Sequence, residues 1–318
     1  MRFVDRVVSK VDNVVKYVFR QGNTYEVEHD KYSHLIEFSY IDNGTGKDIV
    51  CVSCQSMCNM GCKFCHCTDY VGKIPVRNIP ALDIMWGIDF VVKDIGIKNP
   101  TLLISFMGCG EPFNTGNPDV VIDTMLLTQR WNNFEKLYDV VRFGVATCLP
   151  KNRVDRFFKF CQQVKDNNLP VKLHLSLHYT KVFHRNQWMP NSLDIKSSIA
   201  ACNFFRQYTG NKVEVHYTLI EGINDRSQDR DRLARLLRGT DFDIKLITYN
   251  EKETIPYKQN SHPESWRYWL ALALGPGHGN TEVYTPPGRD VGASCGQFMF
   301  EDYDKYLPER HSNVQIIY

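Results

Sequence analysis

The sequence predicts an α/β fold in which repeated strand–helix units surround a parallel sheet. Seven short apolar runs rich in β-branched residues alternate with six segments of helical length and period, which is typical of such units. A chain of 318 residues with 43% hydrophobic residues is long enough to bury a large core. Its unusual cysteine, glycine and histidine motifs follow predicted strands directly, where α/β folds place their active sites.

The elements are predicted in chain order. The first 46 residues are irregular apart from two weak strand-like runs at 14–20 and 35–41. The strands of the regular series are predicted at 48–53, 102–107, 141–147, 171–178, 213–220, 244–249 and 282–285. The helices between them are predicted at 79–95, 119–132, 152–167, 193–208, 227–237 and 263–274. Right-handed crossovers then give an open doubly wound sheet or a barrel, complete or partial.

Composition and charge narrow the class of protein. The mean hydropathy is −0.35, and the longest apolar run is far shorter than the roughly 18 residues that a membrane span needs. The N-terminal residues show no secretory signal, so we expect a cytoplasmic protein that does not enter a membrane. Lys plus Arg is 38 and Asp plus Glu is 36, a net charge of +2. A protein whose main role is non-specific binding of polyanions carries a larger basic excess, so the net charge does not indicate that role for this chain.

The cysteines are the most informative residues. Six of the 11 lie in one segment: Cys51, Cys54, Cys58, Cys62, Cys65 and Cys67. Disulfide scaffolds are typical of short secreted chains, so clustered thiols in this long chain favour metal binding or redox chemistry. Isolated cysteines are usually small buried hydrophobes, and we interpret Cys148, Cys161 and Cys202 in this way. Steric filling is also the interpretation of Cys54, Cys67 and Cys109.

One loop within this segment has the spacing C-x3-C-x2-C, at Cys58, Cys62 and Cys65. Three thiolates on a short loop can hold three irons of a four-iron cluster and leave the fourth iron open to a small molecule. Structural zinc is the alternative, with His66 or Cys67 as the fourth ligand. The spacing is unlike a usual zinc knuckle, and the loop follows the first strand of the series, so the cluster is favoured.

Further motifs follow the triplet in order. They are Gly108-Cys109-Gly110-Glu111-Pro112, Ser176-Leu177-His178, Asn250 at a strand end, and Ser294-Cys295-Gly296-Gln297. A C-x3-C-x-aromatic-C loop after the first strand resembles the radical S-adenosylmethionine (radical SAM) superfamily. From about residue 35 to 298 the motifs together resemble the class A radical SAM RNA methyltransferases, the RlmN and Cfr group. The resemblance implies a partial (β/α)6-type TIM barrel. It also implies a short N-terminal extension (1–46), a radical SAM core (47–300) and a C-terminal tail (301–318).

The same resemblance implies cofactors and site residues. Cys58, Cys62 and Cys65 would ligate a 4Fe-4S cluster that binds S-adenosylmethionine (SAM) at its open iron. Residues expected to contact SAM are Phe64, Gly110, Glu111, Ser176, Leu177, His178 and Asn250. Cys295 would carry a methyl group, Cys51 would form a disulfide with it, and Glu37 would accept a proton. Three positions depart from the family pattern. Cys109 stands where the family usually has Met, Cys54 where it has Ser, and Ala146 or Thr147 where it has a serine at the end of the third strand.

The implied reaction is methylation of an adenine carbon in RNA, at C2 rather than C8. These carbons are too electron-poor to attack the methyl group of SAM, so a carbon radical is the plausible route. The implied partners are ribosomal or transfer RNA and an electron donor such as flavodoxin or ferredoxin. Candidate contacts to the RNA backbone are Lys151, Arg153, Arg156, Arg226, Arg230 and Arg232.

Two alternatives remain open. One is a radical SAM enzyme that acts on a small molecule, a peptide or another nucleic acid, because too few residues precede Glu37 for the family's larger RNA-binding domain. The other is a non-catalytic RNA-binding module stabilised by zinc.

Overall fold

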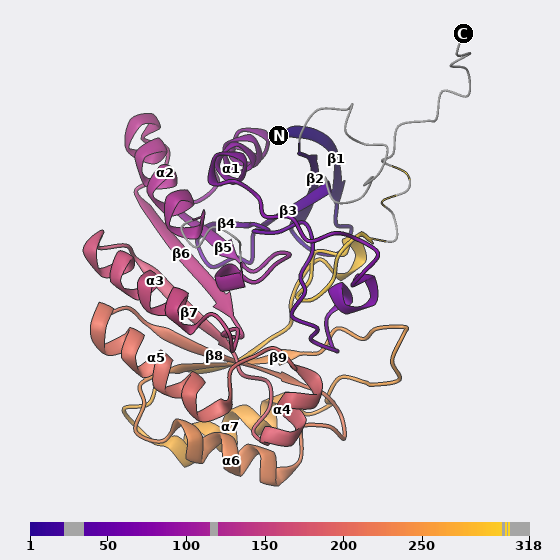
Figure 1. The fold of residues 1–318 in the computed structure, drawn as a ribbon, viewed down its shortest axis with the longest axis vertical. Coiled ribbons are helices and arrows are strands. Elements are labelled where there is room, and N and C mark those ends of the chain that lie inside the picture. Colours follow the sequence, from indigo (N-terminus) through magenta and orange to yellow (C-terminus); the bar gives the residue numbers. More distant parts are fainter. Residues whose placement is uncertain (22–34, 115–119, 301–302, 304, 306–318) are drawn as a thin grey trace, which may run out of the picture.

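The fold is built on one ten-stranded sheet whose strands lie side by side in sequence order. A computed structural model describes residues 1–21, 35–114, 120–300, 303 and 305 of the chain (Figure 1). The strands are β1 (Arg2–Val8), β2 (Val14–Arg20), β3 (Leu35–Ile41), β4 (Lys47–Cys51), β5 (Thr101–Phe106), β6 (Val140–Thr147), β7 (Val171–Ser176), β8 (Val213–Leu219), β9 (Asp243–Thr248) and β10 (Thr281–Tyr284). Pairing is antiparallel from β1 to β4 and parallel from β4 to β10.

Helices connect the parallel strands and cover the outer face of the sheet (Figure 1). They are α1 (Ala81–Ile95), α2 (Val120–Glu135), α3 (Val154–Asp166), α4 (Val182–Trp188), α5 (Ile195–Thr209), α6 (Ser227–Leu237) and α7 (Pro263–Leu274). The predicted alternation of strands and helices is therefore confirmed. Side chains from β3 to β10 line one internal cavity, so the sheet curves around it as a partial barrel.

Helix α3 shows how the core is made. Its buried side chains, Phe157, Phe160, Cys161 and Val164, recur at helical spacing on one face. That face packs against α5, where Phe160 stacks on Phe205 with 6.3 Å between ring centroids. Cys161 and Cys202 are fully buried, as predicted for small core residues.

The N-terminal strands differ from the sequence-based expectation. The weak runs predicted at 14–20 and 35–41 form β2 and β3, but the preceding segment forms a further strand, β1, that was not predicted. Strand β1 is exposed or half-buried throughout, whereas all seven residues of β2 are buried. An edge strand with charged residues has no clear hydrophobic alternation, so its sequence did not reveal it.

Two predicted segments differ from the structure or lie outside the described residues. The short helix α4 lies within a segment that was predicted as a connection. The predicted tail, 301–318, lies outside the described residues except for Tyr303 and Lys305, and residue 119, where the second helix was predicted to begin, is also outside them. Among the described helices there is none with the length and apolar character that crossing a membrane requires.

Candidate functional site

The cysteine loop follows β4, at the carboxyl end of the parallel strands. Cys58, Cys62 and Cys65 are all free and half-buried, and their side chains line one cavity of about 180 Å³. Burial and the neighbouring thiols raise the pKa of Cys58 well above its ordinary value. A bound cation would reverse this effect, because metal coordination deprotonates a thiol.

The spacing of these thiols separates the two metal hypotheses. One tetrahedral zinc ion, with Zn–S bonds of about 2.3 Å, holds its sulfur ligands roughly 3.8 Å apart. Among the described residues, three ligand atoms lie within 4.8 Å of one another only in a different cluster, formed by His174, Glu214 and His216. The three thiols are therefore spread more widely than one zinc ion requires. A cubane cluster takes each thiolate on a different iron, and the arrangement fits that donor set.

Contacts from distant segments hold the cysteine loop in place. Lys252, whose side chain is 2% exposed, donates to the carbonyl oxygens of Lys63 and Cys65 at 3.2 and 3.0 Å and pairs with Asp69 at 2.9 Å. The backbone amide of His66 donates to the carbonyl of Gly296 at 2.9 Å. The loop is thus tied both to the segment after β9 and to the segment that carries Cys295.

The smaller cavity brings together most of the residues predicted to contact SAM. Its lining includes Phe64, Gly110, Glu111, Ser176, His178 and Asn250. The Leu177 side chain is fully buried in the hydrophobic core instead. The ring of Phe64 meets that of His178 edge to face, with 4.9 Å between centroids.

The turn after β5 requires glycine at two positions. A Cβ atom on Gly108 would lie 2.8 Å from the backbone nitrogen of Ser53. Gly110 has φ of +110°, and a Cβ atom there would lie 2.7 Å from Cys54 Sγ. Only glycine permits this close approach of the two strand ends. Cys54 and Cys109 are buried here, and Cys109 Sγ lies 3.7 Å from Cys67 Sγ.

Glu111 is buried and held by residues that the sequence did not identify as its partners. Thr147 Oγ1 donates to Glu111 Oε1 at 2.6 Å, and the Cys148 amide donates to Oε2 at 3.0 Å. Burial raises the pKa of Glu111, and these hydrogen bonds oppose the rise. Cys148, interpreted as a small buried hydrophobe, is indeed buried, but its thiol also lies 3.3 Å from Glu111 Oε2 and lines the cavity.

His178 and Asn250 present polar atoms to the same cavity. The backbone amide of Thr218 donates to His178 Nδ1 at 3.0 Å, and burial lowers the pKa of His178, so the ring is neutral. Asn250 Nδ2 donates to Ser294 Oγ at 2.8 Å and to the carbonyl of Cys295 at 2.7 Å. In the described part of the chain Asn250 Oδ1 is buried and accepts no hydrogen bond. Such an atom needs a polar partner, so it fits a ligand with a hydrogen-bond donor.

A larger cavity of about 910 Å³ lies among the strands of the barrel, and its lining includes Glu37 and Cys51. Glu37 is buried, and its Oε1 accepts from the Met299 amide at 2.9 Å and the Tyr303 hydroxyl at 2.8 Å. Lys16, a residue that the sequence did not single out, forms a buried ion pair with Glu37 Oε2.

Cys295 lines both cavities, and its side chain is exposed to them. The enclosing protein raises the pKa of Cys295 to about 11, an effect that nearby Lys245 opposes. Burial, together with the charge of Cys295, raises the pKa of Cys51 to about 12. The two cysteines predicted to react with each other thus line the same cavity, although they are far apart in the sequence.

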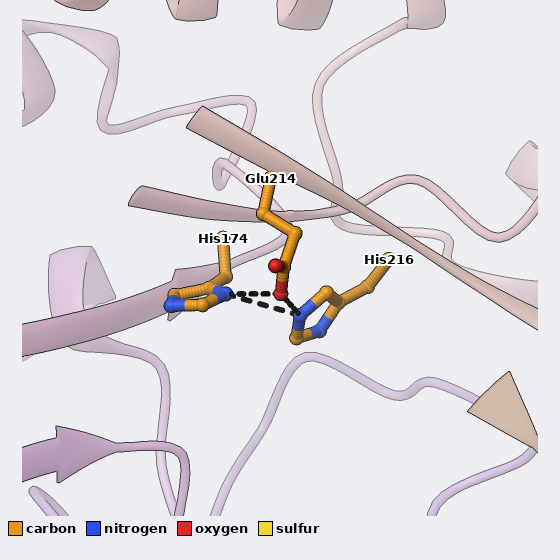
Figure 2. Close-up of side chains that lie close together, drawn as sticks. All are labelled: His174, Glu214 and His216. Carbon is orange, nitrogen blue, oxygen red and sulfur yellow. Dashed lines mark hydrogen bonds and ion pairs between the residues drawn. The ribbon is translucent and has the colours of Figure 1, made fainter. Parts of the chain in front are cut away.

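The barrel also holds a polar cluster that the sequence did not predict. His174 on β7 and Glu214 and His216 on β8 converge on one point (Figure 2). Lys172 and Lys245 both pair with Glu214. His216 lines both cavities. In sequence, the His-x-Ser and Glu-x-His patterns look like ordinary polar positions of strands, and only the register of β7 against β8 brings them together.

The structure divides the basic residues predicted to contact RNA. Arg232 pairs with Asp229 at 2.6 Å, and the Arg230 guanidinium lies 4.1 Å from the centroid of the Trp269 ring. Lys151 and Arg226 donate to the backbone carbonyls of Pro190 and Gly222 at 2.9 and 3.3 Å. Lys151, Arg153 and Arg226 are nevertheless exposed, and Arg156 is half-buried.

Comparison with known proteins gives relatives along nearly the whole chain. The chain is 28% identical over 310 residues to "Probable dual-specificity RNA methyltransferase RlmN" of Lachnoclostridium phytofermentans, covering 96% of this chain and 78% of the relative. It is 26% identical to the protein of the same name in Finegoldia magna, covering 95% and 79% of the two chains. No protein-family model matches.

Among solved structures, the chain resembles a radical SAM methyltransferase from Sphaerobacter thermophilus. The TM-score is 0.73 at 24% identity, covering 94% of this chain and 81% of that one. This likeness confirms the predicted fold, a partial TIM barrel. The curated relatives confirm the resemblance to the RlmN-like enzymes that the motifs predicted.

Proposed function

We propose that this protein is a radical SAM RNA methyltransferase that methylates an adenine carbon, C2 rather than C8. The observation that carries the proposal is the position of Cys295, which lines both the cavity of the cysteine loop and the barrel cavity. Cys58, Cys62 and Cys65 would hold a 4Fe-4S cluster, and the smaller cavity would hold SAM. When bound, these cofactors supply a methyl group and a carbon radical.

In this proposal three residues that line the larger cavity have chemical roles: Cys295, Glu37 and Cys51. The Cys295 thiolate would accept a methyl group and then hold it as a thioether, methyl-cysteine. The methyl carbon would lose one hydrogen atom to the carbon radical that the bound cofactors supply, and it would then bond to the adenine carbon. The adduct would return one electron to the cluster as the substrate carbon loses its proton. Glu37, beside Lys16, accepts the proton that the substrate carbon loses. The Cys51 thiolate attacks Cys295 Sγ; a disulfide forms as the bond from sulfur to the methylene carbon breaks. That carbon keeps the electron pair and takes up a proton to become the methyl group of the product.

The names of the curated relatives support RNA as the substrate. The curated relatives are named RNA methyltransferases, and we propose transfer or ribosomal RNA as the substrate, in the cytoplasm. Exposed Lys151, Arg153 and Arg226 are candidates for contacts to its backbone. A flavodoxin or ferredoxin would supply the electron.

The test is the intact mass of Cys51→Ala purified from cells. Without Cys51 the covalent adduct on Cys295 has no thiol to release it, so we expect protein that carries a nuclease-resistant nucleotide on Cys295. Cys161→Ala, a change at a buried core cysteine, is the matched control and should show no adduct. Unmodified Cys51→Ala protein that still cleaves SAM would contradict the proposal.

A second candidate function is the same chemistry on a small molecule. The barrel cavity of about 910 Å³ is large enough to enclose a whole ligand of drug size. Mass spectrometry of nucleosides from cells with and without the protein distinguishes the two functions. A methyladenosine that depends on the protein supports RNA, and its absence from every RNA pool supports the small molecule.

A further inference from the structure

Three side chains in the barrel present their donor atoms to one another at nearly equal distances. Glu214 Oε1 lies 3.0 Å from His174 Nδ1 and 2.9 Å from His216 Nε2, and the two ring nitrogens are 3.1 Å apart (Figure 2). Glu214 and His216 are two residues apart on β8 and so face the same side, and His174 is the register partner of Glu214 on β7. All three residues are buried.

The donor atoms of this triangle are crowded for ordinary hydrogen bonds. His174, His216 and Lys245 each place a nitrogen within 3.0 Å of the same oxygen, Glu214 Oε1. One carboxylate oxygen has two lone pairs, so it cannot accept three good hydrogen bonds. The two ring nitrogens also face each other.

The triangle has the dimensions of a metal-binding face. A divalent transition-metal ion binds imidazole nitrogen and carboxylate oxygen at about 2.0–2.2 Å, so donors at right angles around it are roughly 2.8–3.1 Å apart. The three observed separations, 2.9, 3.0 and 3.1 Å, fall in this range. Two histidines and one carboxylate on one face of an octahedron leave further positions open.

We propose that His174, Glu214 and His216 form a binding site for a divalent transition-metal ion, separate from the cysteine loop. Its open positions would face the barrel cavity that all three residues line. The inference rests on the geometry of β7 and β8 and does not depend on the proposed RNA methylation.

The net charge of the side chains around the proposed site favours a cation. Lys172 pairs with Asp243 as well as Glu214, and Lys245 pairs with Glu282 at 3.0 Å as well as Glu214. Three carboxylates thus face two ammonium groups, which leaves one net negative charge. When the ion binds Glu214 Oε1, Lys245 keeps its bond to Glu282. Lys172 stays on the other oxygen of Glu214 and orients the carboxylate.

The backbone also leaves space for the histidine. A Cβ atom on Gly144 of β6 would lie 3.2 Å from His174 Nε2. Glycine at this position therefore allows the ring to lie against the neighbouring strand and hold Nδ1 toward Glu214.

Zinc is the probe, because it undergoes no redox chemistry with the thiols. Cluster-reconstituted protein is dialysed anaerobically against Zn²⁺, and bound zinc is measured by elemental analysis. We expect one zinc per chain in addition to the iron, with an X-ray absorption spectrum showing nitrogen and oxygen neighbours. A wild-type protein that binds no zinc, because Lys245 already satisfies Glu214, overturns the proposal. Sulfur neighbours at about 2.3 Å overturn it too, because they would place the zinc on cysteines.

Variants give an independent test. Glu214→Gln and His216→Gln should each weaken zinc binding by at least about tenfold, whereas Ser105→Ala, a change of an uncharged side chain that lines the same cavity, should bind zinc as the wild type does. Lys245→Met should bind zinc more tightly, a gain that misfolding cannot imitate. Wild-type affinity in both Glu214→Gln and His216→Gln overturns the proposal. If Glu214→Gln fails to fold, the zinc affinity of His216→Gln and the X-ray absorption spectrum of the wild type test the proposal.

Discussion

The two cavities that meet at Cys295 are built in different ways. The smaller is lined mainly by residues of loops and strand ends, which occur close together in the sequence, such as Gly110 with Glu111 and Ser176 with His178. The lining of the larger includes many side chains on the strands themselves, among them charged residues such as Lys16 and Glu214. A site on loops is visible as a spacing along the chain, whereas a site on strands exists only when the strands are paired in register.

The comparison predicts that metal binding at the two sites is separable, and this is the largest expected effect. Cys62→Ala should retain less than about a tenth of the wild-type iron after reconstitution, because a thiolate ligand of the proposed cluster is lost. Glu214→Gln should retain the iron, since its carboxylate lies in the other cavity. Iron and sulfide analysis measures both. Equal iron loss in the two variants would show that the cavities do not act separately.

Removing a buried lysine should lower the free energy of unfolding more in the barrel than beside the cysteine loop. Lys16→Met leaves the Glu37 carboxylate buried without its partner, and we expect the free energy of unfolding to fall by about 3–5 kcal/mol. Lys252→Met is the matched change in the loop region, where Asp69 is 30% exposed and can be hydrated. We expect a smaller loss of stability there. Denaturant unfolding compares the two variants, and a larger loss in Lys252→Met would contradict the distinction.

Two glycine substitutions test whether the turn after β5 depends on glycine for the shape of the smaller cavity. Gly110→Ala combines a positive φ with a Cβ contact of 2.7 Å, so we expect a loss of about 2–4 kcal/mol of stability and weaker SAM binding. Gly210 also has a positive φ, of +75°, but a Cβ atom there meets nothing within 4 Å. Gly210→Ala should therefore cost only about 1–2 kcal/mol and leave SAM binding intact. Thermal unfolding and SAM titration measure these effects.

The smallest expected effect on stability concerns the segment that joins the cavities. Asn250→Ala removes two hydrogen bonds to Ser294 and Cys295, and we expect a loss of about 1–2 kcal/mol. Methyl transfer to Cys295 should slow by at least tenfold, since small displacements of a reacting atom are costly. Asn167→Ala, at an exposed position at the end of α3, is the control. An unchanged methylation rate in Asn250→Ala would show that Asn250 does not position Cys295.

Sequence reasoning worked where signals are local. The strands β4 to β10 and their long helices have the lengths and hydrophobic periods that the sequence predicted. It missed β1, an edge strand without a buried face, and the short helix α4. It also missed Thr147 and Cys148 as partners of Glu111. In the sequence, Thr147 stood out as a possible counterpart of a family serine and Cys148 as a small buried hydrophobe, but nothing linked either residue to Glu111.

By itself, the sequence determined the alternation of strands and helices, the cysteine loop and the order of the glycine and histidine motifs. Each is a property of neighbouring residues, because periodicity and ligand spacing act over one loop or one element. The tertiary structure alone decided that Cys51 and Cys295 share a cavity, that Lys16 neutralises Glu37 and that two histidines meet Glu214. Such contacts depend on strand register and on the curvature of the sheet, which the whole core fixes together.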